Sequence, residues 1–368
     1  MTDDYIYLDT AATCPPDPQL IDFVFMKTKT KPYANPSSAH NGGRKARHLI
    51  DISRERIAKS INCEPEEVYF TSGATEACNW AIKNLFAACA NIIHPEVNTE
   101  HEAVRAAVEA YVAYGLPNRG NPACSHPNGY YKMLANNETG DIYDMPKRQN
   151  VDDLIFTDAT AAVGNIAVDF KALNVDYMAF AGHKFGGLPG AGCLIVKKGA
   201  PLIPLIVVGG QEAGMRGGTE NLPAIYSMDL ALQQRPNCAV AHTFQTERKK
   251  MLKAQFMDGL EQIDLCIANF GENKGLYNII NIRIYGVSGA TLAMMLSERG
   301  IMVSTGAACH SNDESPSKTL KAIGLTDEEA LSSIRISFDH RLAFEQCKKA
   351  VEEIKNCVEW LRKKGDVQ

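Results

Sequence analysis

Apolar positions recur along this chain with two different periods. Runs of four or five apolar residues predict short buried strands, whereas apolar residues that recur every three or four positions predict amphipathic helices. In the first 200 residues, strands are predicted at 68–71, 154–157, 177–180 and 192–196, and helices at 75–90 and 101–114. Strands that alternate with helices favour an α/β fold with a mainly parallel sheet.

A second group of elements is predicted in the C-terminal third of the chain. A helix over 239–263 links a large domain to a smaller one and carries Lys249, Lys250 and Lys253 on its polar face. Beyond it, strands are expected at 276–284 and 301–304, and helices at 291–298, 317–323 and 344–363. A chain of 368 residues accommodates about two domains of roughly 100–200 residues each, which agrees with this division.

Composition and charge narrow the class of protein. The formal net charge is -5, and no block of like charge indicates a nucleic-acid or membrane surface. The apolar runs are far shorter than the roughly 20 residues that span a bilayer, and the acidic first four residues do not resemble a signal peptide. Eleven cysteines without a Cys-x-x-Cys pair indicate neither a zinc site nor a disulfide framework. We therefore expect a cytoplasmic protein with reduced thiols.

The segment 179–184, Ala-Phe-Ala-Gly-His-Lys, carries the strongest chemical signal. A lysine on a glycine-rich segment after an apolar run is suited to hold an aldehyde cofactor as a Schiff base. Asp158 ends the apolar run 154–157, and its carboxylate could keep a pyridinium nitrogen protonated. The 26 residues between Asp158 and Lys184 allow one strand–helix–strand return, which would bring both side chains to the same edge of the sheet.

Other polar residues fit a phosphate-bearing ligand but are ambiguous one by one. The segment 73–75 follows a strand and opens a helix, so its backbone N–H groups and the Thr75 hydroxyl suit a phosphate, although a simple helix cap would look the same. His101 offers a flat ring at a second helix start. The loop 216–219 could deliver the Thr219 hydroxyl to a phosphate. Arg335 lies in an alternating strand and needs an anion, either a substrate carboxylate or a structural one.

Cys309 differs in context from the other ten cysteines. It lies in the small, polar segment 304–312, between a predicted strand and a predicted helix. Exposed thiols on loops are the reactive kind, although an incidental surface cysteine would have the same surroundings.

Taken together, the motifs resemble those of a known family. They run in order as Leu-Asp-Thr-Ala-Ala-Thr at 8–13, Asn-Pro-Ser-Ser at 35–38, Ser-Gly-Ala-Thr-Glu at 72–76, Thr-Glu-His at 99–101, Asn-Asn-Glu-Thr-Gly at 136–140, Asp-Ala-Thr at 158–160, Gly-His-Lys at 182–184, Arg-Gly-Gly-Thr-Glu-Asn at 216–221 and Gly-Ala-Ala-Cys at 306–309. The chain resembles the cysteine desulfurases of the nitrogenase-associated and iron–sulfur-assembly branch. These enzymes belong to the class V aminotransferases, among the fold-type I pyridoxal-phosphate enzymes.

The resemblance implies a fold and a set of site residues. A large cofactor-binding domain is expected at 15–250 with a mainly parallel sheet, and a smaller α+β domain at 1–14 and 251–368 carrying the cysteine loop. Lys184 would carry pyridoxal 5'-phosphate as a Schiff base and Cys309 would accept sulfur. The other implied positions are Ala74, Thr75, His183 and a partner subunit's Thr219 at the phosphate, Asp158 and Asn137 beside the ring, His101 stacked on the ring, and Asn35 and Arg335 at the substrate carboxylate.

The chain departs from the family pattern at cofactor positions. Ala161 stands where relatives carry a glutamine that donates to the ring hydroxyl, and Ala181 replaces a serine that donates to the phosphate. Thr10 replaces an asparagine, and the spans 115–132 and 145–153 are short.

The function predicted from these residues is conversion of L-cysteine to L-alanine, with sulfur held as a persulfide on Cys309. The resemblance implies a homodimer and a sulfur-acceptor protein, such as an iron–sulfur scaffold, as partners. Two alternatives fit the same residues. One is another class V transaminase or lyase in which Cys309 is idle, and the other is a weakened scaffold or regulatory relative, as Ala161 and Ala181 suggest.

Overall fold

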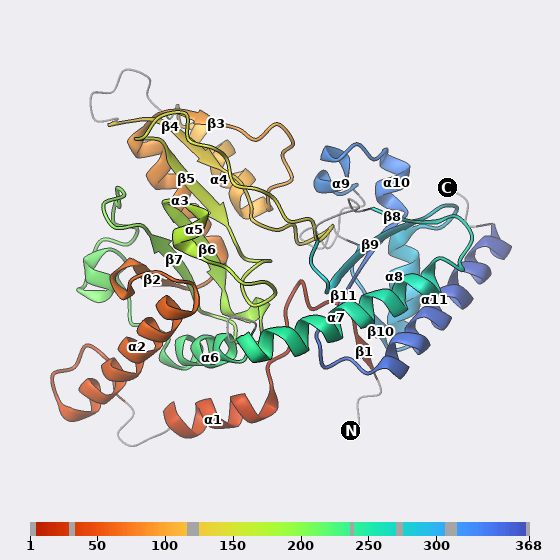
Figure 1. The fold of residues 1–368 in the computed structure, drawn as a ribbon, viewed down its shortest axis with the longest axis horizontal. Helices are drawn as coiled ribbons and strands as arrows, with labels where there is room; N and C mark the ends of the chain where they lie inside the picture. Colours follow the sequence, from red (N-terminus) through yellow and green to blue (C-terminus); the bar gives the residue numbers. More distant parts are fainter. Residues whose placement is uncertain are drawn as a thin grey trace.

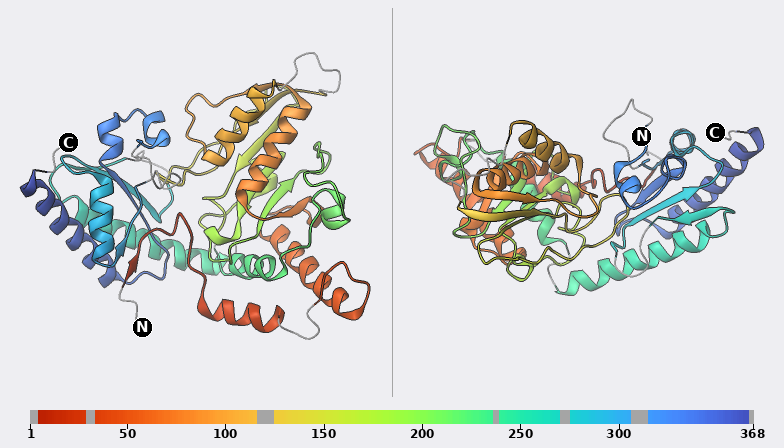
Figure 2. Two further views of the ribbon diagram at one scale, coloured as in Figure 1. Left: turned by 180° about the vertical axis from the view of Figure 1, so that it is seen from behind. Right: turned by 90° about the horizontal axis from the view of Figure 1, so that it is seen from above.

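The computed structural model describes residues 5–28, 34–115, 125–235, 239–269, 275–305 and 315–365, without the side chains of 239–243. Two units lie side by side, each built around its own sheet (Figures 1 and 2). Helix α7 (Ala239–Leu260) runs along both units. Within the described residues, no helix combines the length and apolar character that crossing a bilayer requires.

The larger unit contains a six-stranded sheet. Its strand order is β2 (Val68–Thr71), β7 (Gly192–Val196), β6 (Tyr177–Ala181), β5 (Leu154–Asp158), β4 (His126–Tyr131) and β3 (Cys89–Ile93). Strands β3 to β6 are parallel to one another, and β7 is antiparallel to both of its neighbours. The predicted α/β fold with a mainly parallel sheet is confirmed.

Helices cover both faces of this sheet, which explains why its central strands β5, β6 and β7 are buried at every position. On one face, α3 (Ala74–Ala88) and α4 (Glu102–Ala113) pack against alternate strand residues such as Phe156 and Ala179. On the other face, α1 (Pro18–Thr28), α2 (Asn41–Ser60), α5 (Phe170–Leu173) and α6 (Leu222–Gln233) bury the residues between them, such as Ile155 and Met178.

The smaller unit combines two short sheets with five helices among the described residues. Strands β11 (Ser333–Ser337), β9 (Ile279–Ile284) and β8 (Cys266–Ala268) are antiparallel, and β1 (Ile6–Tyr7) pairs in parallel with β10 (Ile301–Met302). The helices are α7, α8 (Gly289–Glu298), α9 (Lys318–Ala322), α10 (Asp327–Leu331) and α11 (Phe344–Lys364). The N-terminal segment joins this unit because Ile6 and Leu8 are buried in its core.

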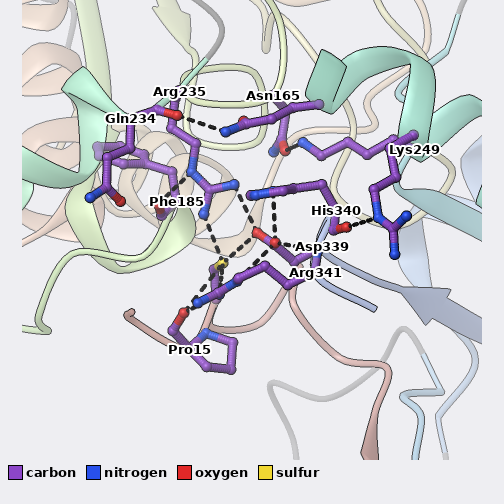
Figure 3. Close-up of polar contacts among 12 residues, drawn as sticks. Pro15, Asn165, Phe185, Gln234, Arg235, Lys249, Asp339, His340 and Arg341 are labelled. Atoms are coloured by element: carbon purple, nitrogen blue, oxygen red, sulfur yellow. Dashed lines mark hydrogen bonds and ion pairs between the residues drawn. The ribbon is translucent and has the colours of Figure 1, made fainter. Parts of the chain in front are cut away.

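We propose that the two units correspond to the expected domains at 15–250 and at 1–14 with 251–368. Separate apolar cores support this division, although Leu276 and Ile279 of the smaller unit pack on a core of the larger one. The polar junction between the units contains Arg235, Asp339 and Lys249 (Figure 3). The prediction that Lys249 lies on a polar helix face is wrong, because its side chain is buried at this junction.

Several predicted element boundaries differ from those in the structure. The strand expected at 276–284 begins at Ile279, and the strand expected at 301–304 ends at Met302. The helix expected at 75–90 ends at Ala88, since the chain enters β3 at Cys89. Short 3-10 turns at η1 (Pro65–Glu67), η2 (Gly182–Lys184) and η3 (Gln211–Gly214) complete the described elements.

Candidate active site

A cavity of about 470 Å³ opens where strands β5 and β6 end. This is the carboxyl edge of the parallel strands, where ligands bind in open α/β sheets. Its walls bring together residues that are far apart in the sequence: Thr10, Ala11, Thr13, Ser72, Gly73, Ala74, Thr75, Glu76, Cys78, His101, Met133, Asn137, Asp158, Thr160, Ala161, Asn165, His183, Lys184, Asn278 and Ile279. Most of the predicted cofactor positions therefore line one cavity.

Lys184 reaches the cavity from the short turn η2, directly after β6. Its amine donates to the carbonyl oxygens of Ala11 at 2.8 Å and Ala12 at 3.0 Å. The turn lies close against α6 because residue 182 is glycine, since a Cβ there would come within 2.8 Å of the Met228 Cβ. Tight packing thus holds the lysine at the carboxyl end of strand β6, in the fixed position that a covalent cofactor anchor requires.

Asp158 is buried at the end of the neighbouring strand. Its Oδ1 accepts a hydrogen bond from the Thr160 backbone N–H at 2.9 Å. The Cys78 thiol of α3 is fully buried against this carboxylate, and burial together with the negative charge raises the pKa of Cys78 well above its usual range. Cys78 therefore stays a neutral thiol that donates to Asp158.

His101 caps the N-terminus of α4. Its Nδ1 accepts from the Ala103 backbone N–H at 3.1 Å. Burial lowers the pKa of His101, and the Lys184 charge lowers it further, although Asp158 opposes both effects. The ring is accordingly held in one orientation as a neutral aromatic surface in the cavity wall.

Glu100, the residue before His101, is a buried acid that the sequence analysis did not assign. Its Oε1 accepts from the Met133 backbone N–H at 2.7 Å, and its Oε2 has no partner within the described structure. Burial raises the pKa of Glu100 to about 8, with a further contribution from Asp158. Glu100 therefore holds its proton at neutral pH.

The phosphate end of the cavity is formed by the start of α3. Gly73 caps this helix, and a Cβ there would meet no atom within 4 Å, so the helix N-terminus faces open space. Glu76 in the first turn accepts a forked ion pair from Arg216, at 2.7 Å from Nε and 3.0 Å from a terminal nitrogen. This pair neutralises an acid that would otherwise repel a phosphate.

His183 forms another wall beside Lys184. Its Nδ1 lies 3.1 Å from the Thr13 hydroxyl. Burial lowers the pKa of His183 to about 4, and the neighbouring Lys184 charge acts in the same direction. The ring is therefore neutral at physiological pH and interacts as a hydrogen-bonding group, without a charge of its own.

The residues present fit pyridoxal 5'-phosphate. The cavity has the size of a ligand site and places an amine, a carboxylate, a flat ring and a helix N-terminus around one space. Two hydroxyls among its lining residues, on Thr10 and Thr160, have no hydrogen-bond partner within the described structure. Lys184 would hold the aldehyde, Asp158 would face the ring nitrogen, and Thr75 with the α3 N-terminus would take the phosphate.

Three predicted site residues in the described part of the chain, Asn35, Thr219 and Arg335, are not among those that line the cavity in the single chain. Arg335 is buried and donates to the Asp9 carboxylate at 2.7 Å and to the Asn137 carbonyl oxygen at 2.9 Å. In the single chain its anionic partner is therefore a structural carboxylate, the second of the two alternatives predicted for it. Asn35 is exposed and accepts from the Ser37 N–H, and Thr219 is exposed on its loop. Cys309 lies outside the described residues.

Comparison with known sequences decides the family. The profile of the class-V aminotransferases matches residues 6–116 and 131–349. The chain belongs to the class-V aminotransferase family. Members of this family depend on pyridoxal phosphate, in agreement with the donor set of the cavity.

Within the class-V family, the chain is similar to proteins named cysteine desulfurase and NifS-like protein. A cysteine desulfurase IscS from Methanosarcina thermophila is 30% identical over 390 aligned positions, which cover 97% of this chain and 93% of the relative. Among solved structures, a NifS-like protein superposes with a TM-score of 0.85 at 27% identity, covering 97% of this chain and all of that one. A NifS-like protein from Rickettsia africae gives a TM-score of 0.82 at 26% identity, covering 96% and 99%.

Two of the departures from the desulfurase pattern, Ala161 and Ala181, fall in different places. Ala161 lines the cavity and offers it no side-chain hydrogen-bond donor. Ala181 is fully buried at the end of β6. Asn165, which was not predicted as a site residue, also lies in the cavity wall, and its Nδ2 donates to the carbonyl oxygen of Ala161, four residues earlier. The spacing of four residues within one turn was the only signal available for it.

Proposed function

We propose that this class-V aminotransferase family member is a pyridoxal-phosphate-dependent cysteine desulfurase that converts L-cysteine to L-alanine and holds the sulfur as a persulfide on Cys309. The observation that carries the proposal is the meeting of Lys184 and Asp158 in one cavity at the carboxyl edge of the sheet. The similarity to proteins named cysteine desulfurase supports the choice of substrate. The role of Cys309 in this proposal rests on its sequence context alone.

The residues divide the chemistry between them. When bound, the cofactor withdraws electrons from the substrate carbon skeleton, which makes the Cβ–Sγ bond labile. Lys184 first holds the cofactor, and its amine then moves the Cα proton as a general base. Asp158 faces the ring nitrogen, while the neighbouring Glu100 holds a proton and Cys78 donates to the Asp158 carboxylate as a neutral thiol.

Sulfur transfer requires a thiolate nucleophile. In the proposed step, the Cys309 thiolate attacks the substrate sulfur, a new S–S bond forms, and the Cβ–Sγ bond breaks. The bonding electrons stay on Cβ, which takes up a proton and becomes the methyl group of alanine. The persulfide is then passed to an acceptor protein, for which an iron–sulfur scaffold fits the relatives' role.

A second copy of the chain is proposed to complete the site. Val207 and Val208 leave 76% and 81% of their surface exposed, which is unusual for adjacent valines. Their segment pairs with the Arg216 loop, since the Gly217 N–H donates to the Ile206 carbonyl oxygen at 3.0 Å. We propose that a partner subunit covers this surface and receives Thr219 at its phosphate site.

The dimer proposal has a direct test. Chains carrying Thr219→Val and chains carrying Lys184→Ala are purified separately and then mixed under conditions that allow subunit exchange. If Thr219 serves the partner's site, mixed dimers contain one intact site and recover activity. If the activity of the mixture stays at the level of the separate variants, the proposal that Thr219 acts in the partner's site is contradicted.

A cytoplasmic location is also proposed. All eight cysteines in the described parts of the chain are free thiols, which is typical of a reducing compartment.

The activity is tested by an absorbance spectrum of the purified protein, recorded before and after L-cysteine, with sulfide and amino-acid products measured in parallel. A desulfurase shows a visible cofactor band that changes with cysteine, releases sulfide with a reductant, and forms alanine. A keto acid without sulfide indicates a transaminase. A protein that acquires no band with added cofactor indicates a scaffold, and either result overturns the proposal.

A further inference from the structure

Lys249 is a buried cation that reaches the wall of the cofactor cavity. It projects from α7 at the junction of the two units, and only 2% of its side chain is exposed (Figure 3). Its Nζ donates to Asn165 Oδ1 at 2.9 Å. Within the described part of the chain this amide oxygen is its hydrogen-bond partner, so an ammonium group is buried against a neutral acceptor.

Asn165 connects this lysine to the cavity. It lines the cavity together with Asp158, Thr160 and Ala161, all on the segment after β5. Its Nδ2 donates to the Ala161 carbonyl oxygen at 3.0 Å. One N–H of the amide is therefore used, and no acceptor among the described residues takes the second.

Lys249 fixes which way the Asn165 amide points. An ammonium group can only donate, so the amide atom that faces it must be the oxygen. The NH2 group must then face Ala161 and the cavity. The Ala161 carbonyl oxygen can only accept and favours the same orientation, so a neutral neighbour in place of Lys249 would leave the amide held from the Ala161 side alone.

Burying the Lys249 ammonium group lowers the stability of the folded protein. Burial lowers the pKa of Lys249 to about 8, and the Arg235 charge lowers it further, whereas Asp339 and Cys14 oppose these effects. Substituting apolar residues of similar volume for buried charged groups is often neutral or stabilising. This arrangement therefore points to a role for the oriented amide.

We propose that Asn165, oriented by Lys249, donates its second amide N–H to the ring hydroxyl oxygen of bound pyridoxal phosphate. Asp158 lies on the same segment and faces the ring nitrogen in the proposed function, on which this inference rests. Besides the ring nitrogen, the hydroxyl oxygen is the other polar atom attached directly to the ring. Ala161 lines the cavity but has no side-chain donor for this oxygen. Asn165 is a direct contact of the cofactor, and Lys249 is a positioning residue.

Thr160 is the competing donor. Its hydroxyl lacks a partner within the described structure, and the residue lines the same cavity. The Thr160 oxygen is enclosed by protein atoms, however, so it would have to rotate to reach a ligand. A Thr160→Val variant separates the two donors because it removes the hydroxyl and keeps the shape.

The test measures the cofactor dissociation constant and the wavelength of the visible band in the wild type and in four variants. In Asn165→Ala, the loss of one hydrogen bond should weaken cofactor binding by about two- to tenfold and shift the band. Lys249→Met should shift the band in the same direction. Lys253→Met is the matched control, since Lys253 is half-buried one turn later on α7 and donates to the Leu276 carbonyl oxygen instead. Thr160→Val should leave the band unchanged.

A rescue experiment makes the assignment specific. Adding Ala161→Gln to the Asn165→Ala variant supplies a new donor on the same wall and should restore both the affinity and the band. An unchanged band in Asn165→Ala, or a shift in Thr160→Val alone, overturns the inference. Equal effects of Lys249→Met and Lys253→Met overturn the positioning role. A wild-type chain that binds no cofactor overturns the proposed function itself, which separates the two failures.

Discussion

The Arg235 guanidinium lies 2.7 Å from the Asp339 carboxylate, and both groups are buried where the two units meet. Arg235 follows α6 of the larger unit, and Asp339 follows β11 of the smaller one. The Cys14 thiol lies 3.4 Å from the same carboxylate, and Arg341 adds a second cation at 3.0 Å. Burial raises the pKa of Asp339, but the hydrogen bond from His340 and the Arg235 charge hold it well below its usual range.

The first prediction concerns the stability that this pair contributes. Asp339→Asn leaves Arg235 buried without a counter-ion, which typically costs about 3–5 kcal/mol of unfolding free energy. Denaturant unfolding at pH 7 measures this loss. Asp152→Asn is the control because Asp152 is exposed on a surface turn, and it should change stability by less than about 0.5 kcal/mol.

The pH dependence of the same pair has a defined sign. The folded-state pKa of Asp339 lies below the unfolded-state value, so its contribution is present above about pH 4 and is lost as the pH falls through the folded-state pKa. The wild type should therefore lose more stability than Asp339→Asn on acidification below pH 4. Parallel curves for the two proteins in this range would contradict the assignment.

The sequence allowed the sheet of the larger unit to be predicted only in part. Strands β5, β6 and β7 are buried on both faces, so they read as continuous apolar runs and were predicted almost residue by residue. Strand β4 was not predicted because it contains Pro127, Asn128 and Gly129, which have low strand propensity. Its place beside β5 depends on tertiary packing, which overrides these local preferences.

The candidate site shows the same limit. The Asp158–Lys184 spacing predicted their meeting, because one strand–helix–strand return leaves little choice of geometry. The Lys249–Asn165 contact joins residues 84 positions apart, one on α7 and the other on the segment after β5. Helical spacing predicts Lys249 on a polar face, but Asn165 of the larger unit contacts its amine, and no local pattern indicates that contact.

The second prediction concerns the covalent anchor. Borohydride reduction of the cofactor-loaded protein, followed by peptide mapping, should place the label on Lys184. This lysine is half-buried in the cavity and held by two carbonyl oxygens, whereas Lys197 and Lys198 are exposed after β7. A label on either of those residues would show that the cavity has been assigned to the wrong chemistry.

The third prediction concerns the sulfur acceptor. Cys309→Ser should keep cofactor binding and the first spectral change with cysteine, but sulfide release should fall to the level without enzyme. Cys266→Ser is the control, because burial raises the pKa of the half-buried Cys266 to about 11 and makes its thiol a poor nucleophile. Sulfide release by Cys309→Ser at the wild-type rate would exclude the persulfide step.

The fourth prediction concerns the stability cost of Lys249. Its folded-state pKa of about 8 lies below the usual value of 10.5, so the unfolded chain binds more protons between these two values. Stability should therefore rise with pH across this window, by about 2 kcal/mol between pH 7.5 and pH 9.5 for this group alone. Other lysines titrate as well, so the quantity to measure is the difference between the wild type and Lys249→Met.

The expected outcome combines stability with cofactor binding. Denaturant unfolding at the two pH values should give a rise in the wild type that is about 2 kcal/mol larger than the rise in Lys249→Met. At pH 7.5, Lys249→Met should lose no stability, because the substitution removes a charge that is costly to bury. The same variant should bind pyridoxal phosphate more weakly, because the Asn165 amide is then held from the Ala161 side alone. If Lys249→Met keeps the full pH-dependent rise, Lys249 is not a buried cation in the folded protein, and its proposed hold on the Asn165 amide loses its physical basis.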